Sequence, residues 1–126
     1  MGIIVALAGG VGAAKLLRGL VQVVPPQNLV IVGNTGDDVE LYGLHVSPDL
    51  DTVMYTLAGV VDEAKGWGVA GDTFHCLEML GKLGFENWFR LGDRDLAIHV
   101  ARTAMLKKGM PLSQATAELC GMLGVK

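Results

Sequence analysis

A strand, a glycine-rich turn and a helix follow one another without interruption in residues 3–15, IIVALAGGVGAAK. The apolar run at residues 3–8 has the length and composition of a strand buried on both faces. Gly9, Gly10 and Gly12 follow, and apolar residues then recur at helical spacing until Pro25-Pro26. Glycines let a backbone approach an anion closely, and a helix N-terminus offers it free N–H groups. The stretch therefore indicates a phosphate site in an α/β fold.

The glycine spacing matches neither common phosphate-binding motif. A dinucleotide fingerprint needs a third glycine where this chain has Lys15, and a Walker loop needs Gly-Lys-Ser/Thr, whereas Leu16 follows the lysine. Lys15 lies one turn into the predicted helix, where a lysine can meet a phosphate. A tight strand–helix turn without a ligand, carrying a solvated lysine, is the alternative.

Composition limits the class of protein. The chain has 126 residues, a hydrophobic fraction of 51% and a net charge of −3, which suit one domain that handles small molecules. The negative charge and the lack of a basic stripe argue against nucleic acid. The apolar start has neither a basic leader nor a cleavage site and is too short to cross a bilayer, which predicts a cytoplasmic protein with no membrane partner. Cys76 and Cys120 fall in helical patterns and are predicted to be buried thiols.

A second buried strand is predicted at residues 29–32, and a right-handed crossover should place it parallel to the first. Its polar continuation, residues 33–38, then lies beside the glycine turn, where open α/β sheets bind ligands. Asp37 and Asp38 suggest Mg²⁺, which prefers oxygen ligands and bridges phosphates. Asn, Gly and Asp are also turn residues, so a plain turn is the alternative.

Four further helices are predicted. Ser47 caps the first of them, with Pro48 at its first position and Asp49 in its first turn. Capping does not require Asp51, and spacing alone favours a solvated carboxylate there. Asp72 and Ser113 are expected to cap the second and the last helix. The third opens with Asp93-Arg94-Asp95. Its predicted inner face consists of Ala97, Val100, Ala101 and Ala104, and that of the last helix of Leu119, Met122 and Leu123.

The fold class predicted from these segments is α/β, a Rossmann-like parallel sheet flanked by helices. Only two convincing buried strands occur, and a parallel sheet of two strands leaves both edges and part of both faces without cover. Residues 1–126 are therefore expected to be the N-terminal part of a single larger Rossmann-like domain, or to pair with another chain.

Five motifs together resemble the 2-phospho-L-lactate transferase family of coenzyme F-420 biosynthesis. They are GGVG with Lys15, NTGDD at 34–38, GLHVSPDLDT at 43–52, GWG at 66–68 and RLGDRD at 90–95. Each is weak alone, but their order and spacing are specific, above all SPDLDT and LGDRD. The resemblance covers the whole chain and about the first two-fifths of a typical member, which agrees with the expected truncation.

The resemblance implies a reaction. A guanosine-diphospho donor carrying lactate, or enolpyruvate in actinobacterial members, is attacked by the terminal ribityl hydroxyl of the deazaflavin FO. GMP leaves, and Mg²⁺ is required. Family members are often homodimers.

The resemblance also implies roles for residues of this chain. Asp51 and Arg94 are associated with FO, and Asp51 can also orient or deprotonate the attacking hydroxyl. Asp37 and Asp38, with Asp49, hold the metal, and Asp37, Asp38 and Asp51 are the catalytic acids. The remaining substrate-binding residues are Gly9, Gly10, Gly12, Lys15, Asn34, Thr35 and Asp93.

Two alternatives stand beside the transferase. One is a non-catalytic protein of a related family with a similar glycine-rich start, which binds nucleotide sugars and regulates cell-envelope metabolism. The SPDLDT and LGDRD matches favour the transferase. The other is an α/β fragment without a site, which does not explain why acids and glycines gather at both strand ends.

Overall fold

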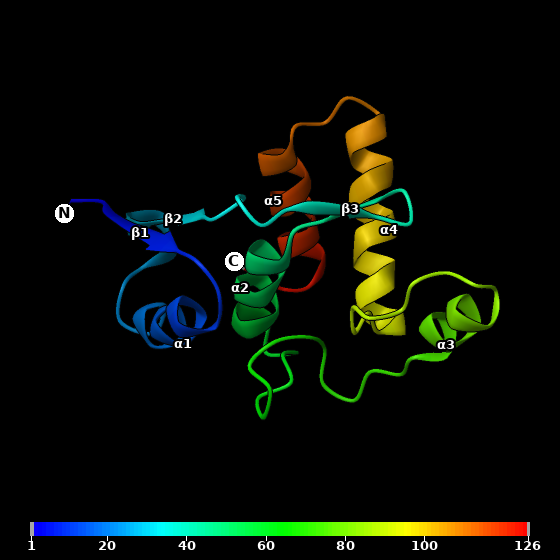
Figure 1. Ribbon diagram of the computed structural model, residues 1–126. Helices are drawn as coiled ribbons and strands as arrows, with labels where there is room; N and C mark the ends of the chain where they lie inside the picture. The colour runs from blue at the N-terminus through cyan, green and yellow to red at the C-terminus, as the bar shows by residue number, and fades with distance from the viewer. Residues whose placement is uncertain (1, 126) are drawn as a thin grey trace.

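Residues 4–33 form a βαβ unit. The computed structural model describes residues 2–125. Strands β1 (Ile4–Ala8) and β2 (Leu29–Gly33) form a parallel ladder in which Ile4 lies opposite Leu29 and Ala8 opposite Gly33. Helix α1 (Val11–Leu20) and the short 3-10 helix η1 (Pro26–Asn28) connect them, with α1 against one face of the sheet (Figure 1). The predicted parallel pair and the α/β fold class are confirmed.

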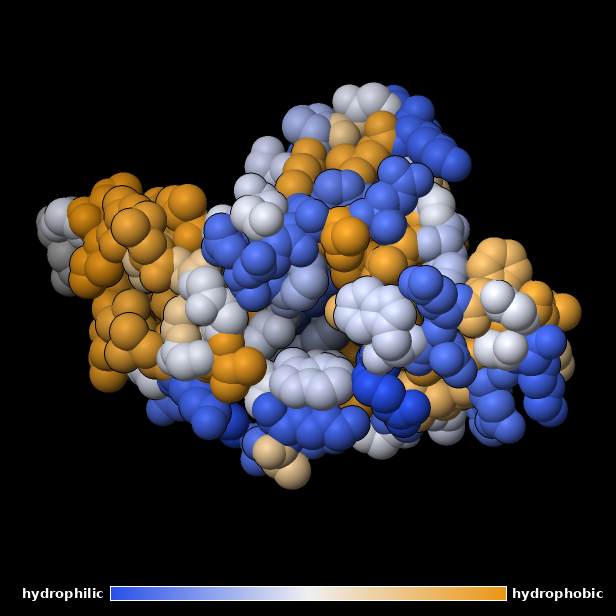
Figure 2. Space-filling model, in the orientation of Figure 1, coloured by the Kyte–Doolittle hydropathy of each residue, from blue (hydrophilic) through white to orange (hydrophobic). Residues whose placement is uncertain are grey.

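Only one face of this sheet is covered. Ala8, Ala14, Leu17 and Val53 form a buried cluster between β1, α1 and α2. The other face presents Val5, Leu7, Val30 and Val32, each between 45% and 81% exposed. The prediction that residues 3–8 are buried on both faces is therefore wrong for this chain. Figure 2 shows apolar side chains gathered over this end of the molecule.

A β-hairpin that the sequence did not reveal follows the βαβ unit. Strands β3 (Val39–Leu41) and β4 (Leu44–Val46) pair antiparallel, with Leu41 opposite Leu44. Tyr42 and Gly43 turn the chain with φ of 53° and 75°, the left-handed values of a two-residue hairpin turn. The Tyr42 hydroxyl donates to the backbone oxygen of Glu86, which ties the tip of the hairpin to a distant segment.

Helix α2 (Pro48–Ala58) is the central element. Its residue Val53 belongs to the cluster under the sheet, while Met54 and Tyr55 join Val61 and Leu119 in a second cluster. Proline at the first helical position and Gly59 with φ 76° just past the end explain its limits. Helix α2 thus connects the βαβ unit to the helical half of the chain.

The helical half consists of α3 (His75–Lys82), α4 (Asp93–Lys107) and α5 (Leu112–Met122), with α4 packed against α5 and β4 (Figure 1). The predicted inner face of α4 is only partly right: Ala101 packs against the second cluster, but Ala97, Val100 and Ala104 are exposed. The fully buried residues of α4 are His99, Arg102 and Thr103, which are polar, so an apolar periodicity could not identify them.

Three smaller expectations also fail. Ser113 lies inside α5, whose N-cap residue is Pro111, so it is not the cap. Met122 is 69% exposed, whereas Leu119 is buried as predicted. Cys76 and Cys120 are free and half-buried rather than buried.

None of the helices in residues 2–125 has the length and apolarity that a membrane crossing needs.

Candidate functional site

The loops that follow β1 and β2 meet at the carboxyl end of the sheet. The Asn34 backbone N–H donates to the Ala8 carbonyl at 2.8 Å. The Asn34 side-chain amide donates to Asp49 at 2.8 Å and to Asp37 at 3.4 Å, and its oxygen accepts the Gly36 N–H. A Cβ on Gly10, which has φ 86°, would lie 3.7 Å from an Asp49 carboxylate oxygen. The structure therefore brings Gly10, Asn34, Asp37 and Asp49 together, and residues 33–38 lie beside the glycine turn as predicted.

The other residues predicted to bind a ligand at this end of the sheet are mostly exposed to solvent. Gly9 lies against the Asn34 side chain, and Gly12, Lys15 and Thr35 are exposed around the same turn. Helix α1 begins after Gly10 with no side chain capping its N-terminal N–H groups. These donors are therefore available to an anion.

Asp38 turns away from Asp37 and toward the hairpin. Its Oδ2 lies 2.9 Å from His45 Nε2 and accepts the Ser47 hydroxyl at 2.8 Å. Ser47 is the residue before α2, but its hydroxyl donates to Asp38 and does not cap the helix. The predicted side-chain cap is therefore wrong. Asp38 Oδ1 is buried and has no hydrogen-bond partner among residues 2–125. A buried carboxylate oxygen without a partner suits a cation or a ligand donor.

A pocket of about 290 Å³ lies between α2, α4 and two loops, and Figure 2 shows it as a hollow in the face of the molecule. Aromatic side chains form part of its walls. Trp67 contributes from the loop after α2, and Trp88 and Phe89 contribute from the segment before α4. Such a volume is close to the lower limit for small-molecule sites. Aromatic walls favour a planar ring.

The loops that carry these walls stack on one another. The Lys65 ammonium lies 5.0 Å from the Trp67 ring centre, and the Arg90 guanidinium lies 4.0 Å from that of Phe74. Cation–π contacts of this kind stabilise an exposed arrangement modestly. They join the loop after α2 to the segment that carries Trp88 and Phe89.

A buried ion pair lies beneath the pocket. Asp51, from the first turn of α2, is 4% exposed, and the Arg102 guanidinium, from α4, is fully buried. Arg102 Nη1 donates to Asp51 Oδ2 at 3.2 Å and Nη2 donates to Oδ1, so both carboxylate oxygens are engaged. Burial raises the pKa of Asp51 above its usual range, although the Arg102 charge opposes this. The expectation of a solvated Asp51 is wrong.

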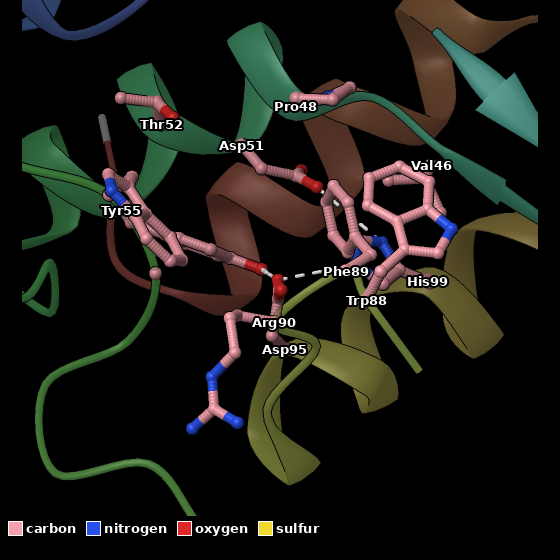
Figure 3. Close-up of a pocket in the computed structure, with 12 residues that line it drawn as sticks. Val46, Pro48, Asp51, Thr52, Tyr55, Trp88, Phe89, Arg90, Asp95 and His99 are labelled. Carbon is pink, nitrogen blue, oxygen red and sulfur yellow. Dashed lines mark hydrogen bonds and ion pairs between the residues drawn. The ribbon is translucent and has the colours of Figure 1, made fainter. Parts of the chain in front are cut away.

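Three more polar groups complete the pocket floor. The Tyr55 hydroxyl donates to Asp95 Oδ1 at 2.5 Å, and His99 Nε2 lies 3.4 Å from the same oxygen (Figure 3). Burial next to the Asp51 and Asp95 carboxylates raises the pKa of Tyr55, which stays a donor. Asp51, Asp95 and His99 bring ligand atoms within 4.8 Å of one another, an arrangement compatible with a metal ion. The imidazole and the adjacent Arg102 charge make it less suited to Mg²⁺ than an all-oxygen set.

Asp93 and Arg94 do not line this pocket. Asp93 accepts the backbone N–H groups of His75 and Cys76 and so caps α3, while Arg94 is exposed. Asp72, predicted to cap α3, instead accepts the N–H groups of Arg94 and Asp95 at the start of α4. That prediction is therefore wrong, because the two acids cap each other's helix.

The fold and these two sites define an α/β protein with a glycine turn suited to an anion beside an aromatic small-molecule pocket. The family model described as 2-phospho-L-lactate transferase CofD matches residues 4–126, and the chain belongs to that family.

Curated relatives carry the name phosphoenolpyruvate transferase. The relative in Streptomyces coelicolor is 55% identical over 118 residues, which are 93% of this chain and 37% of the relative. The relative in Thermobifida fusca is 50% identical, and the match covers 93% of this chain and 39% of the relative. The relative in Mycobacterium tuberculosis is 47% identical, and the match covers 90% of this chain and 39% of the relative. The chain thus spans less than two-fifths of the length of these relatives.

Proposed function

We propose that this chain is the N-terminal part of a single Rossmann-like transferase domain in coenzyme F-420 biosynthesis. The enzyme transfers a phospholactate or phosphoenolpyruvate group from a guanosine-diphospho donor to FO and releases GMP. The family match and the relatives named phosphoenolpyruvate transferase support a phosphotransferase, and those names favour the enolpyruvyl donor.

One observation carries this proposal: the first turn of α2 belongs to both sites. Asp49 lies beside Gly10 and accepts a hydrogen bond from Asn34, whereas Asp51, two residues later, lines the aromatic pocket. A transferase must bring a phosphate-bearing donor and an acceptor together in one geometry. A helix turn that reaches both sites suits this task.

The donor end combines a glycine turn with carboxylates. The open N-terminus of α1, with Gly9, Gly10, Gly12 and Lys15, would receive the diphosphate, and Asn34 and Thr35 would line its other side. Asp37, Asp38 and Asp49 would hold Mg²⁺: the unpartnered Asp38 oxygen and the hard oxygen donors suit that ion, although the three carboxylates do not form a preassembled ligand cluster among residues 2–125. When bound, Mg²⁺ neutralises phosphate charge as the leaving group departs.

The acceptor end is the aromatic pocket. The planar deazaflavin ring would stack between the walls that Trp67, Trp88 and Phe89 provide. Asp51 would orient the ribityl hydroxyl, and Arg94, at the exposed start of α4, would meet the outer part of FO together with Asp93.

The test is a GMP-release assay on the full-length protein with the guanosine-diphospho-acid donor. We expect release only when both FO and Mg²⁺ are present, because the acceptor hydroxyl is the nucleophile. GMP release at the same rate without FO would exclude the transferase and indicate a hydrolase.

A further inference from the structure

The floor of the aromatic pocket contains a buried histidine nitrogen without a partner. His99 is 1% exposed and lines the pocket, and its Nε2 has no hydrogen-bond partner among the residues that the structure describes. Buried polar atoms of this kind are rare in folded proteins unless a water or a ligand meets them.

The tautomer of His99 follows from its neighbour. Nδ1 lies 3.3 Å from Arg102 Nη1, a group that only donates hydrogen bonds, and 3.5 Å from Asp51 Oδ2, which already accepts from Arg102; the nearer neighbour of Nδ1 is thus a donor. Nδ1 therefore accepts, and in the neutral imidazole the hydrogen is on Nε2. His99 thus presents an N–H donor to the floor of the pocket.

Asp95 supplies the matching acceptor. Tyr55 and His99 both lie against Oδ1 of Asp95, and no hydrogen bond to its Oδ2 occurs among residues 2–125, so Oδ2 can accept one from a ligand. Asp51 differs, because Arg102 engages both of its oxygens. In Figure 3 the side chains of Tyr55, Asp95 and His99 converge at one point of the pocket, while Arg90 points away.

We propose that Asp95 and His99 form a donor–acceptor pair that hydrogen-bonds a ligand group which itself carries an adjacent donor and acceptor. This inference rests on the proposed function, since the ligand is then FO. FO offers this chemistry at its hydroxyls and at the imide edge of its ring. The two groups compared below are the terminal ribityl hydroxyl, which is the reacting group, and the imide edge. Besides the role proposed above, Asp51 also positions the imidazole of His99 through Arg102.

The experiment compares FO with two analogues, one lacking the terminal hydroxyl and one methylated at the imide nitrogen. Binding is followed by FO fluorescence in EDTA, for the wild-type protein and for Asp95→Asn, His99→Leu and His99→Gln. We expect the wild type to bind FO about tenfold more tightly than one of the analogues, a typical effect of one hydrogen bond to a charged group. Asp95→Asn and His99→Leu should reduce that ratio to about one, and His99→Gln, which keeps an N–H donor, should restore part of it.

The ratio separates recognition from folding, because a variant that merely loosens the pocket weakens FO and its analogues alike. Glu118→Gln is the matched control, because it converts an exposed carboxylate on α5 to an amide as Asp95→Asn does, and it should keep the wild-type ratio.

An Asp95→Asn and a His99→Leu protein that retain the full ratio would overturn the inference while leaving the proposed function intact. A ratio that appears only with added Mg²⁺ would also overturn it, in favour of a cation at Asp51, Asp95 and His99. A wild type that binds no FO would contradict the proposed function itself, and this inference with it.

Discussion

Asp72 and Asp93 cap each other's helices. The Asp72 carboxylate, just before α3, accepts the N–H groups of Arg94 at 2.9 Å and Asp95 at 3.1 Å in the first turn of α4. Asp93, the first residue of α4, accepts those of His75 at 3.0 Å and Cys76 at 2.9 Å in α3. The exchange joins two helices whose starts are 18 residues apart in the sequence, and it anchors the segment that carries Trp88 and Phe89.

Asp72→Ala should destabilise the chain by about 1–2 kcal/mol, because it removes a capping acceptor from the first turn of α4. Urea unfolding followed by circular dichroism measures the change. The exposed Glu118→Gln should alter the free energy of unfolding by less than about 0.5 kcal/mol. Equal small effects from both substitutions would show that the exchanged cap contributes little.

Asp93 should make stability depend on acid pH. Hydrogen bonds from Thr73 and from the Cys76 and His75 backbone lower the pKa of Asp93 from its usual 3.8. A lowered folded-state pKa gives stability that is present above 3.8 and is lost as the pH falls through the lower folded value. Asp93→Asn should therefore flatten the decline in unfolding free energy below pH 3.8. A decline of unchanged slope in this variant would rule out Asp93 as its source.

Gly92→Ala should be damaging despite its ordinary backbone. A Cβ at this position would overlap the Asp72 carboxylate and displace the cap, which we expect to cost about 1–3 kcal/mol in thermal or urea unfolding. Gly121→Ala is the matched control, since a Cβ there meets nothing within 4 Å and alanine favours a helix. It should be neutral or stabilising, and a similar loss at both positions would contradict this account.

Removing Arg102 should leave Asp51 as an uncompensated buried charge. Arg102→Met is expected to destabilise the chain by about 3–5 kcal/mol, measured by urea unfolding. The double variant Asp51→Leu with Arg102→Met should recover most of that loss, because it removes both charges together. A double variant as unstable as the single one would mean that shape rather than charge dominates here.

Asp51→Asn should affect the two substrates unequally in the full-length enzyme. We expect the KM for FO to rise about tenfold or more while guanine-nucleotide affinity changes little, because Asp51 lies in the aromatic pocket and not at the glycine turn. Steady-state kinetics with FO varied, and a separate GMP titration, give both values. Equal losses for both ligands would contradict the assignment of Asp51 to the acceptor.

The elements set by local sequence were predictable. The apolar runs of β1 and β2, the glycines of the turn and the prolines that limit α1 and α2 each act through neighbours in the chain, and the structure has them where expected. The hairpin was missed because its strands have three residues each and its turn is Tyr42-Gly43 rather than the usual Asn-Gly.

The buried polar groups were not predictable, because their partners are remote. Local spacing predicts a solvated Asp51 because it gives no information on Arg102, its partner 51 residues later in the chain. For the same reason, no site role could be predicted for Tyr55, Asp95 or His99, although Asp95 belongs to the RLGDRD motif. The only local signal was the departure of α4 from apolar periodicity, where His99, Arg102 and Thr103 occupy the inner face. The sequence also does not indicate that Asp72 caps α4 and Asp93 caps α3, because each acid lies next to the other helix in the chain.

The first turn of α2 has a consequence for how substrates are bound. Asp49 and Asp51 belong to one turn, so under the proposed function a shift of that turn by one substrate would also move the group that meets the other. Thermodynamic linkage would then require reciprocity: whatever factor the donor applied to the affinity for FO, FO would apply to the affinity for the donor. Two binding sites that share one turn of helix are expected to be coupled in this way.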